Sequence, residues 1–225
     1  MSKSKAFRLP TFLLDGKEGE AVDRLEDYLA HDPGQPGGVA YTGSLFDTWD
    51  RGGDRPEVAD HFTNSDVVAV GFLSVRVRPR AAIQLLQTDA DEINPLLAQI
   101  PVDVDLAHTS AELVGAGQPA DQLWNKLRHL DHVGPTIAGK LLARKRPRLI
   151  PVYDSLVKAL VGAPPNFWES LRVALQDDGG ALTERLHRIG TDAGVPDLSI
   201  LRVFDIVAWM EAKGLKGEQR TSVHP

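Results

Sequence analysis

Apolar residues recur at helical spacing along most of the chain, in segments that Gly, Pro, Asp and Asn residues separate. Ala21, Leu25 and Leu29, for example, share one helix face before Asp32-Pro33-Gly34 ends the segment. Residues 101–106 alternate in polarity but have no partner segment, so we expect extended coil there. The pattern predicts an all-α protein. The helices are expected over 18–31, 79–86, 92–100, 110–114, 120–130, from 135 onward, 154–161, 167–175, 182–189 and 199–213.

Two regions fit this pattern less directly. Residues 62–75 have a Thr63-Asn64-Ser65 cap before an apolar run whose valines suit helix or strand, although its length and cap favour a helix. Residues 32–56 are rich in Gly and Pro and hold the aromatic residues Tyr41, Phe46 and Trp49, so we expect an ordered loop packed on the body. We therefore divide the chain into a divergent extension over 1–60, a helical domain over 61–215 and a tail over 216–225.

Composition limits the class of protein. A chain of 225 residues is long enough to bury a core. No apolar run reaches the roughly 18–20 residues of a membrane span, and the start of the chain lacks the apolar core of a signal peptide, so we expect a cytoplasmic protein. The absence of cysteine excludes disulfides and thiolate metal sites, and the seven histidines have no metal-binding spacing. No metal or other cofactor is expected.

Charge is distributed unevenly. The net charge is −6, yet residues 124–160 contain eight Lys and Arg against two Asp. A local basic face on an acidic body suits a protein that binds one polyanion at one place. Cations at a helix end also interact favourably with the helix dipole, so the cluster at residues 144–148 fits a solvated helix end equally well.

Within that basic region, a tight turn at Asp131-His132-Val133-Gly134-Pro135 separates two amphipathic segments. A glycine in such a turn lets the backbone approach a phosphate, and amides at the start of the second helix point at it. Val133 would anchor the turn in the core, while His132, Gly134 and Thr136 would offer backbone contacts. We therefore expect DNA binding through this hairpin, extended by a set of cations. These are Lys140, Arg144, Lys145, Arg146 and Arg148.

The hairpin and the residues after it resemble the helix-hairpin-helix DNA glycosylase superfamily over residues 123–160. Leu127 and Leu130 before the turn, Val133-Gly134 within it, and Ala138 with Leu141-Leu142 after it carry the resemblance. The stretch "IPVYDSLVKAL" is similar to the family's Pro-Val-Asp-Thr-His-Val sequence. Asp154 follows Gly134 by twenty residues, which is the interval expected between the family's hairpin glycine and its catalytic aspartate.

The resemblance implies a fold and an activity. The fold is a helix-hairpin-helix glycosylase-like domain of two helical subdomains, with the hairpin over 120–146 and a flipped-out nucleotide held between the subdomains. Asp154 would stabilise the cationic sugar as the base leaves. The position of the Schiff-base lysine in bifunctional members corresponds to Thr136, which cannot form an imine, so a monofunctional enzyme is implied. His132 replaces the first hairpin glycine, and Tyr153 is an added residue beside the acid.

Several residues have structural alternatives. Asp is a favoured helix N-cap, worth about 1 kcal/mol, so Asp154 also fits a purely structural role. Tyr153, Tyr41, Phe46 and Trp49 form a candidate base pocket, because flipped bases stack on aromatic rings, but such residues equally fit a core. Asp205 is expected to be a surface or buried hydrogen-bonding residue rather than an acid–base partner.

Three functions therefore remain open. The first is a base-excision type of hydrolase that acts on N-glycosidic bonds of DNA. The second is a catalytically silent nucleic-acid-binding protein, and the third is reuse of the fold without nucleic acid. An open cleft beside Asp154, with aromatic walls and the hairpin on its rim, would favour the hydrolase. A cleft filled by residues 32–62 would favour the others. DNA is the expected partner, and no membrane is expected to be one.

Overall fold

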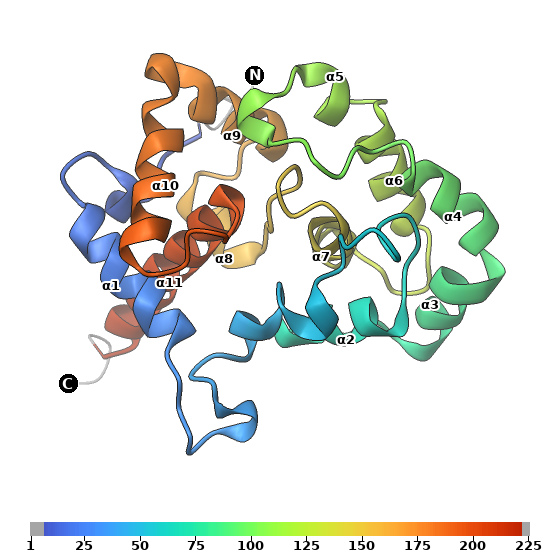
Figure 1. Ribbon diagram of the computed structural model, residues 1–225, viewed down its shortest axis with the longest axis horizontal. Helices are drawn as coiled ribbons and strands as arrows, with labels where there is room; N and C mark the ends of the chain where they lie inside the picture. The colour runs from blue at the N-terminus through green and yellow to red at the C-terminus, as the bar shows by residue number, and fades with distance from the viewer. Residues whose placement is uncertain (1–6, 222–225) are drawn as a thin grey trace.

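Helices form along the segments that the apolar periodicity predicts. The computed structural model describes residues 7–221, and side chains through residue 215 (Figure 1). No strand forms within 7–221, where the only β-type pairing is an isolated antiparallel bridge between His31 and Val39. The all-α class is therefore confirmed. The helices are α1 (Glu18–Leu29), α2 (Asn64–Phe72), α3 (Pro79–Ile83), α4 (Ala90–Leu97), α5 (Ala111–Val114), α6 (Pro119–Leu127), α7 (Pro135–Lys145), α8 (Ser155–Leu160), α9 (Phe167–Gln176), α10 (Ala181–Asp192) and α11 (Ile200–Thr221).

The helices form two lobes (Figure 1). In the middle lobe, which consists of α2 to α7, α7 packs against α2 and α6, and α6 packs against α4. In the terminal lobe, α11 packs against α1, α8 and α10. The division expected at residue 60 does not coincide with the division between the lobes, because α1 belongs with the C-terminal helices. Helix α11 also continues to Thr221, six residues into the segment expected to be a tail.

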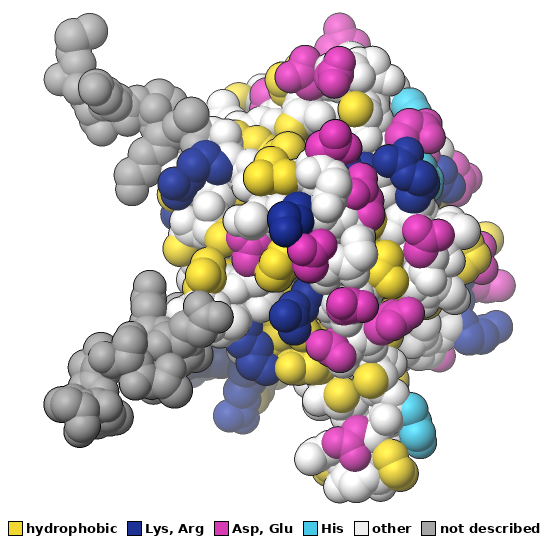
Figure 2. Space-filling model, turned by 90° about the vertical axis from the view of Figure 1, so that its left-hand side faces the viewer, with side chains coloured by type: hydrophobic (Ala, Val, Ile, Leu, Met, Phe, Trp, Pro, Cys, Tyr) yellow, Lys and Arg dark blue, Asp and Glu magenta, His cyan; other side chains and the backbone are white. Residues whose placement is uncertain are grey.

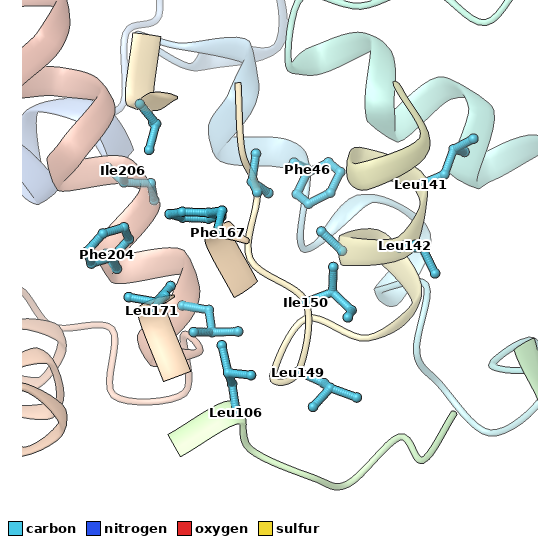
Figure 3. Close-up of a cluster of buried hydrophobic side chains, with 14 of the residues drawn as sticks. Phe46, Leu106, Leu141, Leu142, Leu149, Ile150, Phe167, Leu171, Phe204 and Ile206 are labelled. Carbon is cyan, nitrogen blue, oxygen red and sulfur yellow. The ribbon is translucent and has the colours of Figure 1, made fainter. Parts of the chain in front are cut away.

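One continuous apolar core joins the two lobes (Figure 3). The connection between α7 and α8 runs between the lobes and buries Leu149 and Ile150 almost completely. Leu142 contributes from the middle lobe, and Phe167 and Phe204 contribute from the terminal lobe. Since burial of each large apolar side chain stabilises the fold by about 1.5–3 kcal/mol, this shared core fixes the lobes relative to one another.

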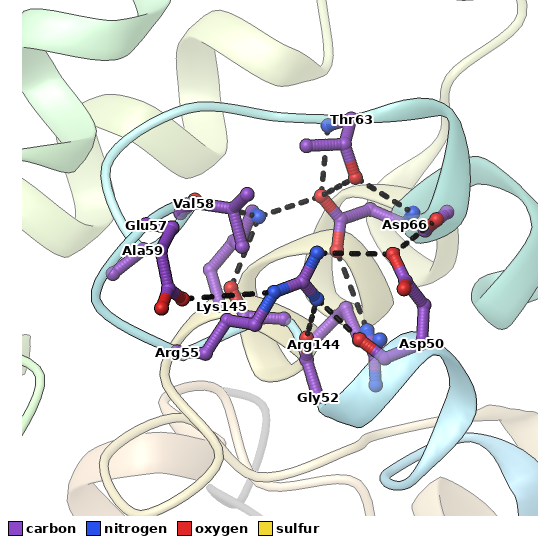
Figure 4. Close-up of polar contacts among 12 residues, drawn as sticks. Asp50, Gly52, Arg55, Glu57, Val58, Ala59, Thr63, Asp66, Arg144 and Lys145 are labelled. Carbon is purple, nitrogen blue, oxygen red and sulfur yellow. Dashed lines mark hydrogen bonds and ion pairs between the residues drawn. The ribbon is translucent and has the colours of Figure 1, made fainter.

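The irregular region between α1 and α2 is held by cations from the end of α7 (Figure 4). Arg144 donates to the carbonyl oxygens of Asp47 and Trp49, at 3.0 and 2.5 Å, and Lys145 donates to that of Gly53 at 3.0 Å. Arg146 donates to the carbonyl of Ala59 at 2.7 Å. This region has only short 3-10 turns, at Pro36–Gly38, Thr42–Leu45 and Trp49–Arg51, which leave many carbonyl groups unpaired, and these side chains supply the missing donors.

This arrangement corrects a prediction. Arg144, Lys145 and Arg146 were expected to form an exposed DNA clamp, but their side chains are at most 1% exposed. Asp66, which is itself 1% exposed, lies 3.3 Å from Arg144 Nε and 2.6 Å from Lys145 Nζ and neutralises part of the buried charge. The three cations build the fold and cannot contact a DNA backbone.

No helix in the part of the chain that the structure describes is both long enough and apolar enough to cross a bilayer.

Candidate functional site

The turn between α6 and α7 is held from three sides. Val133 is buried, and its N–H donates to the carbonyl of Leu130 at 3.1 Å. Trp124 Nε1 donates to the carbonyl of Pro135 at 3.3 Å, and the amide of Asp131 donates to the side chain of Gln84 at 2.8 Å. These contacts fix the start of α7 relative to the rest of the middle lobe.

Two positions of this turn differ in their backbone requirements. His132 is exposed and has a φ of 55°, the left-handed region that favours glycine. Gly134 is the N-cap of α7 with φ −88° and ψ 179°, which any residue adopts. A Cβ added at Gly134 would meet no atom of the protein within 4 Å. The protein itself therefore gives no steric reason for a glycine at this position.

A cleft of about 480 Å³ opens between the lobes. This volume lies in the range of roughly 300–1,000 Å³ that is usual for small-ligand sites. Thr136 and Lys140 line it from α7, and Asp154 lines it from the start of α8. Val152, Ser155 and Leu156 line it around Asp154, and Tyr28 lines it from α1. The remaining walls come from residues 41–43, residues 72–75 and the α11 side chains of Arg202, Asp205, Ile206 and Trp209.

Asp154 is the N-cap of α8 and is half-buried at the cleft. Its Oδ1 accepts from the amides of Leu156 at 2.9 Å and Val157 at 3.0 Å. Within the side chains that the structure describes, no hydrogen bond to Oδ2 is present. One carboxylate oxygen thus fixes the side chain, and the other remains available to a ligand in the cleft.

Aromatic rings form one wall of the cleft. Tyr41 stacks on Tyr28 with 5.2 Å between ring centroids and 7° between planes, and Trp209 meets both rings edge-on. All three line the cleft. Tyr28 and Trp209 were not foreseen, because each lies in an amphipathic helix where a ring normally indicates core.

The other rings expected in a base pocket lie elsewhere, which corrects that part of the prediction. Phe46 is 1% exposed and belongs to the core. Trp49 does not line the cleft, and its ring packs on that of Phe72 with 5.1 Å between the centroids. Tyr153 turns away and stacks on Phe167 at 3.8 Å. Burial raises the pKa of Tyr153 to about 12, and its buried hydroxyl has no partner among the described residues.

Charged groups at the base of the cleft are buried and close together. Lys140 Nζ donates to the carbonyl of Leu73 at 2.8 Å. Burial lowers the pKa of Lys140, although the negative charges of Asp154 and Asp205 act to raise it. Arg202 Nε donates to Asp47 at 2.7 Å and also pairs with Asp205. Burial, together with the negative charge of Asp154, raises the pKa of Asp205 to about 7, while Arg202 and Lys140 only partly offset these effects.

Lys140 and Arg148 also differ from their expected positions. Lys140 is 3% exposed and faces the cleft instead of an outer surface. Arg148 is exposed, but Asp105 accepts from its Nε at 2.8 Å and from its Nη2 at 2.5 Å. No group of three or more His, Asp or Glu that could hold a metal ion occurs among residues 7–215.

Together these features define an all-α protein with two lobes, whose cleft presents one positioned carboxylate, a lysine and stacked aromatic rings. The sequence model of a family of unknown function (DUF6308) matches residues 21–212, and the chain belongs to this family. The match includes α1 from Ala21 onward and every residue that lines the cleft. Searches of curated proteins and of solved structures gave no match.

Proposed function

We propose that this protein binds DNA and hydrolyses the N-glycosidic bond between a base and its deoxyribose, with Asp154 as the acidic group at the sugar. Its two lobes would then be a divergent form of the helix-hairpin-helix DNA glycosylase fold. The observation that carries the proposal is that Asp154, Thr136 and Tyr41 line one open cleft. Residues 41–43 form a wall of that cleft and do not fill it.

The chemistry follows from the free carboxylate oxygen. A flipped base would stack on the wall of Tyr41 and Trp209. As the bond from C1′ to the base nitrogen breaks, its electron pair leaves with the base and positive charge develops on the sugar. Asp154 Oδ2 would stabilise that charge. A water oxygen then bonds to C1′ and its proton passes to solvent, which yields a free base and an abasic sugar. Thr136 has no amine, so the strand stays intact.

The test is a single-turnover assay with the full chain on short duplexes that carry uracil, hypoxanthine, an alkylated purine or an oxidised purine. Alkali cleaves the abasic product and reveals base release. We expect base release from at least one duplex. For Asp154→Asn we expect the rate of release to be lower by a factor of at least about 100. Since Asn is as good an N-cap as Asp, this substitution removes the charge while it retains the helix start.

Asp32→Asn is the matched control, because Asp32 Oδ1 also accepts a backbone amide, that of Gly34 at 3.0 Å, at an exposed position. Its rate should equal that of the wild type. Equal rates for the wild type and Asp154→Asn would contradict the role of Asp154, and no base release from any duplex would count against hydrolysis of these bases.

A second candidate is a DNA-binding protein without catalysis. The two amide contacts to Asp154 Oδ1 favour it, since they account for the residue as a helix cap. This candidate predicts duplex binding that depends on salt, unchanged binding by Asp154→Asn and no abasic product.

A further inference from the structure

Three exposed arginines lie close together in the chain, two in the connection between α2 and α3 and one at the start of α3. Arg76, Arg78 and Arg80 are exposed, whereas Val75 and Val77 between them pack against the core. Packed and exposed side chains alternate from Val75 to Arg78, as along an extended segment, so Arg76 and Arg78 point to solvent together, and Arg80 is exposed in the first turn of α3. Among the side chains that the structure describes, none of these three makes an ion pair or a hydrogen bond. Their charge therefore has no structural partner, unlike that of Arg144, Arg146 and Arg202.

These arginines lie beside the turn between α6 and α7. Arg76, Arg78, Pro79, His132 and Ile137 line one groove of about 570 Å³, which contains no acidic side chain. A smaller depression of about 410 Å³ is lined by Arg80 and His129, with Asp131 as its acidic group. The left-handed residue His132 and the start of α7 thus share a surface with two free guanidinium groups.

The same segment also borders the cleft. Leu73, Ser74 and Val75 line the cleft, and Arg76 follows them directly in the groove. Ser74 has a φ of 60°, so the chain bends sharply where it passes from the one to the other. An extended ligand that lies in the groove would therefore continue to the cleft mouth.

The charge on the rest of the surface favours binding of a polyanion at the arginines over binding elsewhere. Helix α1 lies at the end of the molecule opposite to α3 (Figure 1), and Asp and Glu side chains gather over the face that carries α1 (Figure 2). Asp23, Glu26 and Asp27 of α1 are exposed there. A polyanion is repelled at this end and attracted at the groove, so the net charge of −6 does not oppose binding at the arginines.

We propose that the groove formed by Arg76, Arg78 and His132 binds the phosphate backbone of a DNA strand and directs it into the cleft. This inference rests on the proposed function for the identity of the polyanion. Arginine suits the role because its planar group donates two parallel hydrogen bonds to a phosphate. Gly134 lies in the chain between His132 and Ile137, which line the groove, and a Cβ added there would meet no atom of the protein within 4 Å. The groove thus takes the role that the buried cations at residues 144–146 do not fill.

The experiment measures binding of the full chain to a fluorescein-labelled duplex by anisotropy over a range of NaCl concentrations. For the double variant Arg76→Gln, Arg78→Gln we expect at least about tenfold weaker binding. The slope of log K against log salt should become shallower by about 2, since each lost phosphate contact removes about 0.9. Arg24→Gln, Arg188→Gln is the control, because both residues are exposed on α1 and α10 and should change neither quantity.

The outcomes separate this inference from the proposed activity. Weaker binding with a shallower slope supports the groove, whether or not any base is released. An unchanged slope and affinity in a folded double variant overturns the groove and leaves the Asp154 assay unaffected. A wild type that does not bind duplex at low salt overturns both. Thermal unfolding followed by circular dichroism checks that the variants are folded.

Discussion

The fold does not require a glycine at position 134, so a glycine there points to a requirement set by a ligand. Its backbone angles suit any residue, and the space around a Cβ there is empty. Gly53 is the opposite case, because a Cβ would lie 2.6 Å from the carbonyl oxygen of Arg144 and 2.8 Å from Asp66 Oδ1. Packing explains Gly53, whereas packing does not explain Gly134, and under the proposed function the close approach of a phosphate would explain it.

We predict that Gly134→Ala changes the free energy of unfolding by less than about 1 kcal/mol, because only the N-cap preference differs. The same substitution should weaken duplex binding about tenfold or more, because the methyl group lies where the backbone would contact phosphate. Urea unfolding and anisotropy measure the two effects. Gly19→Ala in α1, where a Cβ also meets nothing, should leave binding unchanged. A large loss of stability without a loss of binding would contradict the explanation.

Among the elements, the connection from α7 to the 46–60 loop depends on one buried acid. Asp66 caps α2 through Thr63, whose N–H donates to Oδ2 at 2.8 Å, and it also neutralises Arg144 and Lys145. One carboxylate therefore joins α2, α7 and the loop (Figure 4).

We predict that Asp66→Asn lowers the free energy of unfolding by about 3–5 kcal/mol, because it leaves two buried cations without their counter-charge. Glu20→Gln is the control, since Glu20 pairs with Lys17 and both side chains are about half exposed, and it should leave the free energy of unfolding almost unchanged. Urea unfolding followed by circular dichroism compares them. Similar losses from both variants would show that burial of Asp66 is unimportant.

Periodicity and capping residues predicted the helices, because both act over a few residues. The Thr63 cap and the turn at Val133-Gly134 were foreseeable for the same reason. The burial of Arg144 to Arg146 was not, since their acceptors lie near residues 46–60 and 97–100, far away in sequence. Likewise, the position of Asp154 in a cleft stays ambiguous in sequence, where a helix cap and a catalytic acid look the same. Arg202 and Asp205 had a weak signal, namely two charges three residues apart on an otherwise apolar helix.

At the scale of the whole molecule, the cleft couples stability to pH through Asp205. Its pKa is about 7 in the folded protein, against about 3.9 in an unfolded chain. Between these values the unfolded chain has released a proton that the folded protein retains. The contribution of Asp205 to stability therefore falls as the pH rises from about 4 to 7, and it is constant above that range.

We predict that the unfolding free energy of the wild type, relative to that of Asp205→Asn, decreases as the pH rises from 4.5 to about 7.5. Urea unfolding of both proteins across this range measures the difference. Asp15→Asn, at a side chain that is 92% exposed, should give a curve parallel to the wild type. A pH-independent difference for Asp205→Asn would contradict the raised pKa.

The pairing of α1 with α11 has a consequence for synthesis. Tyr28 and Arg202, which meet beside the cleft, are 174 positions apart in the chain. At about 5–20 residues per second, a ribosome takes roughly 10–35 s to add the residues between them. Helices α2 to α7 are contiguous in the chain and are synthesised completely during that interval. The apolar side of α1 has no α11 to pack against until the interval ends. The cleft is therefore the last part of the molecule to assemble on a nascent chain, and a chain released before α11 lacks Trp209 in its aromatic wall.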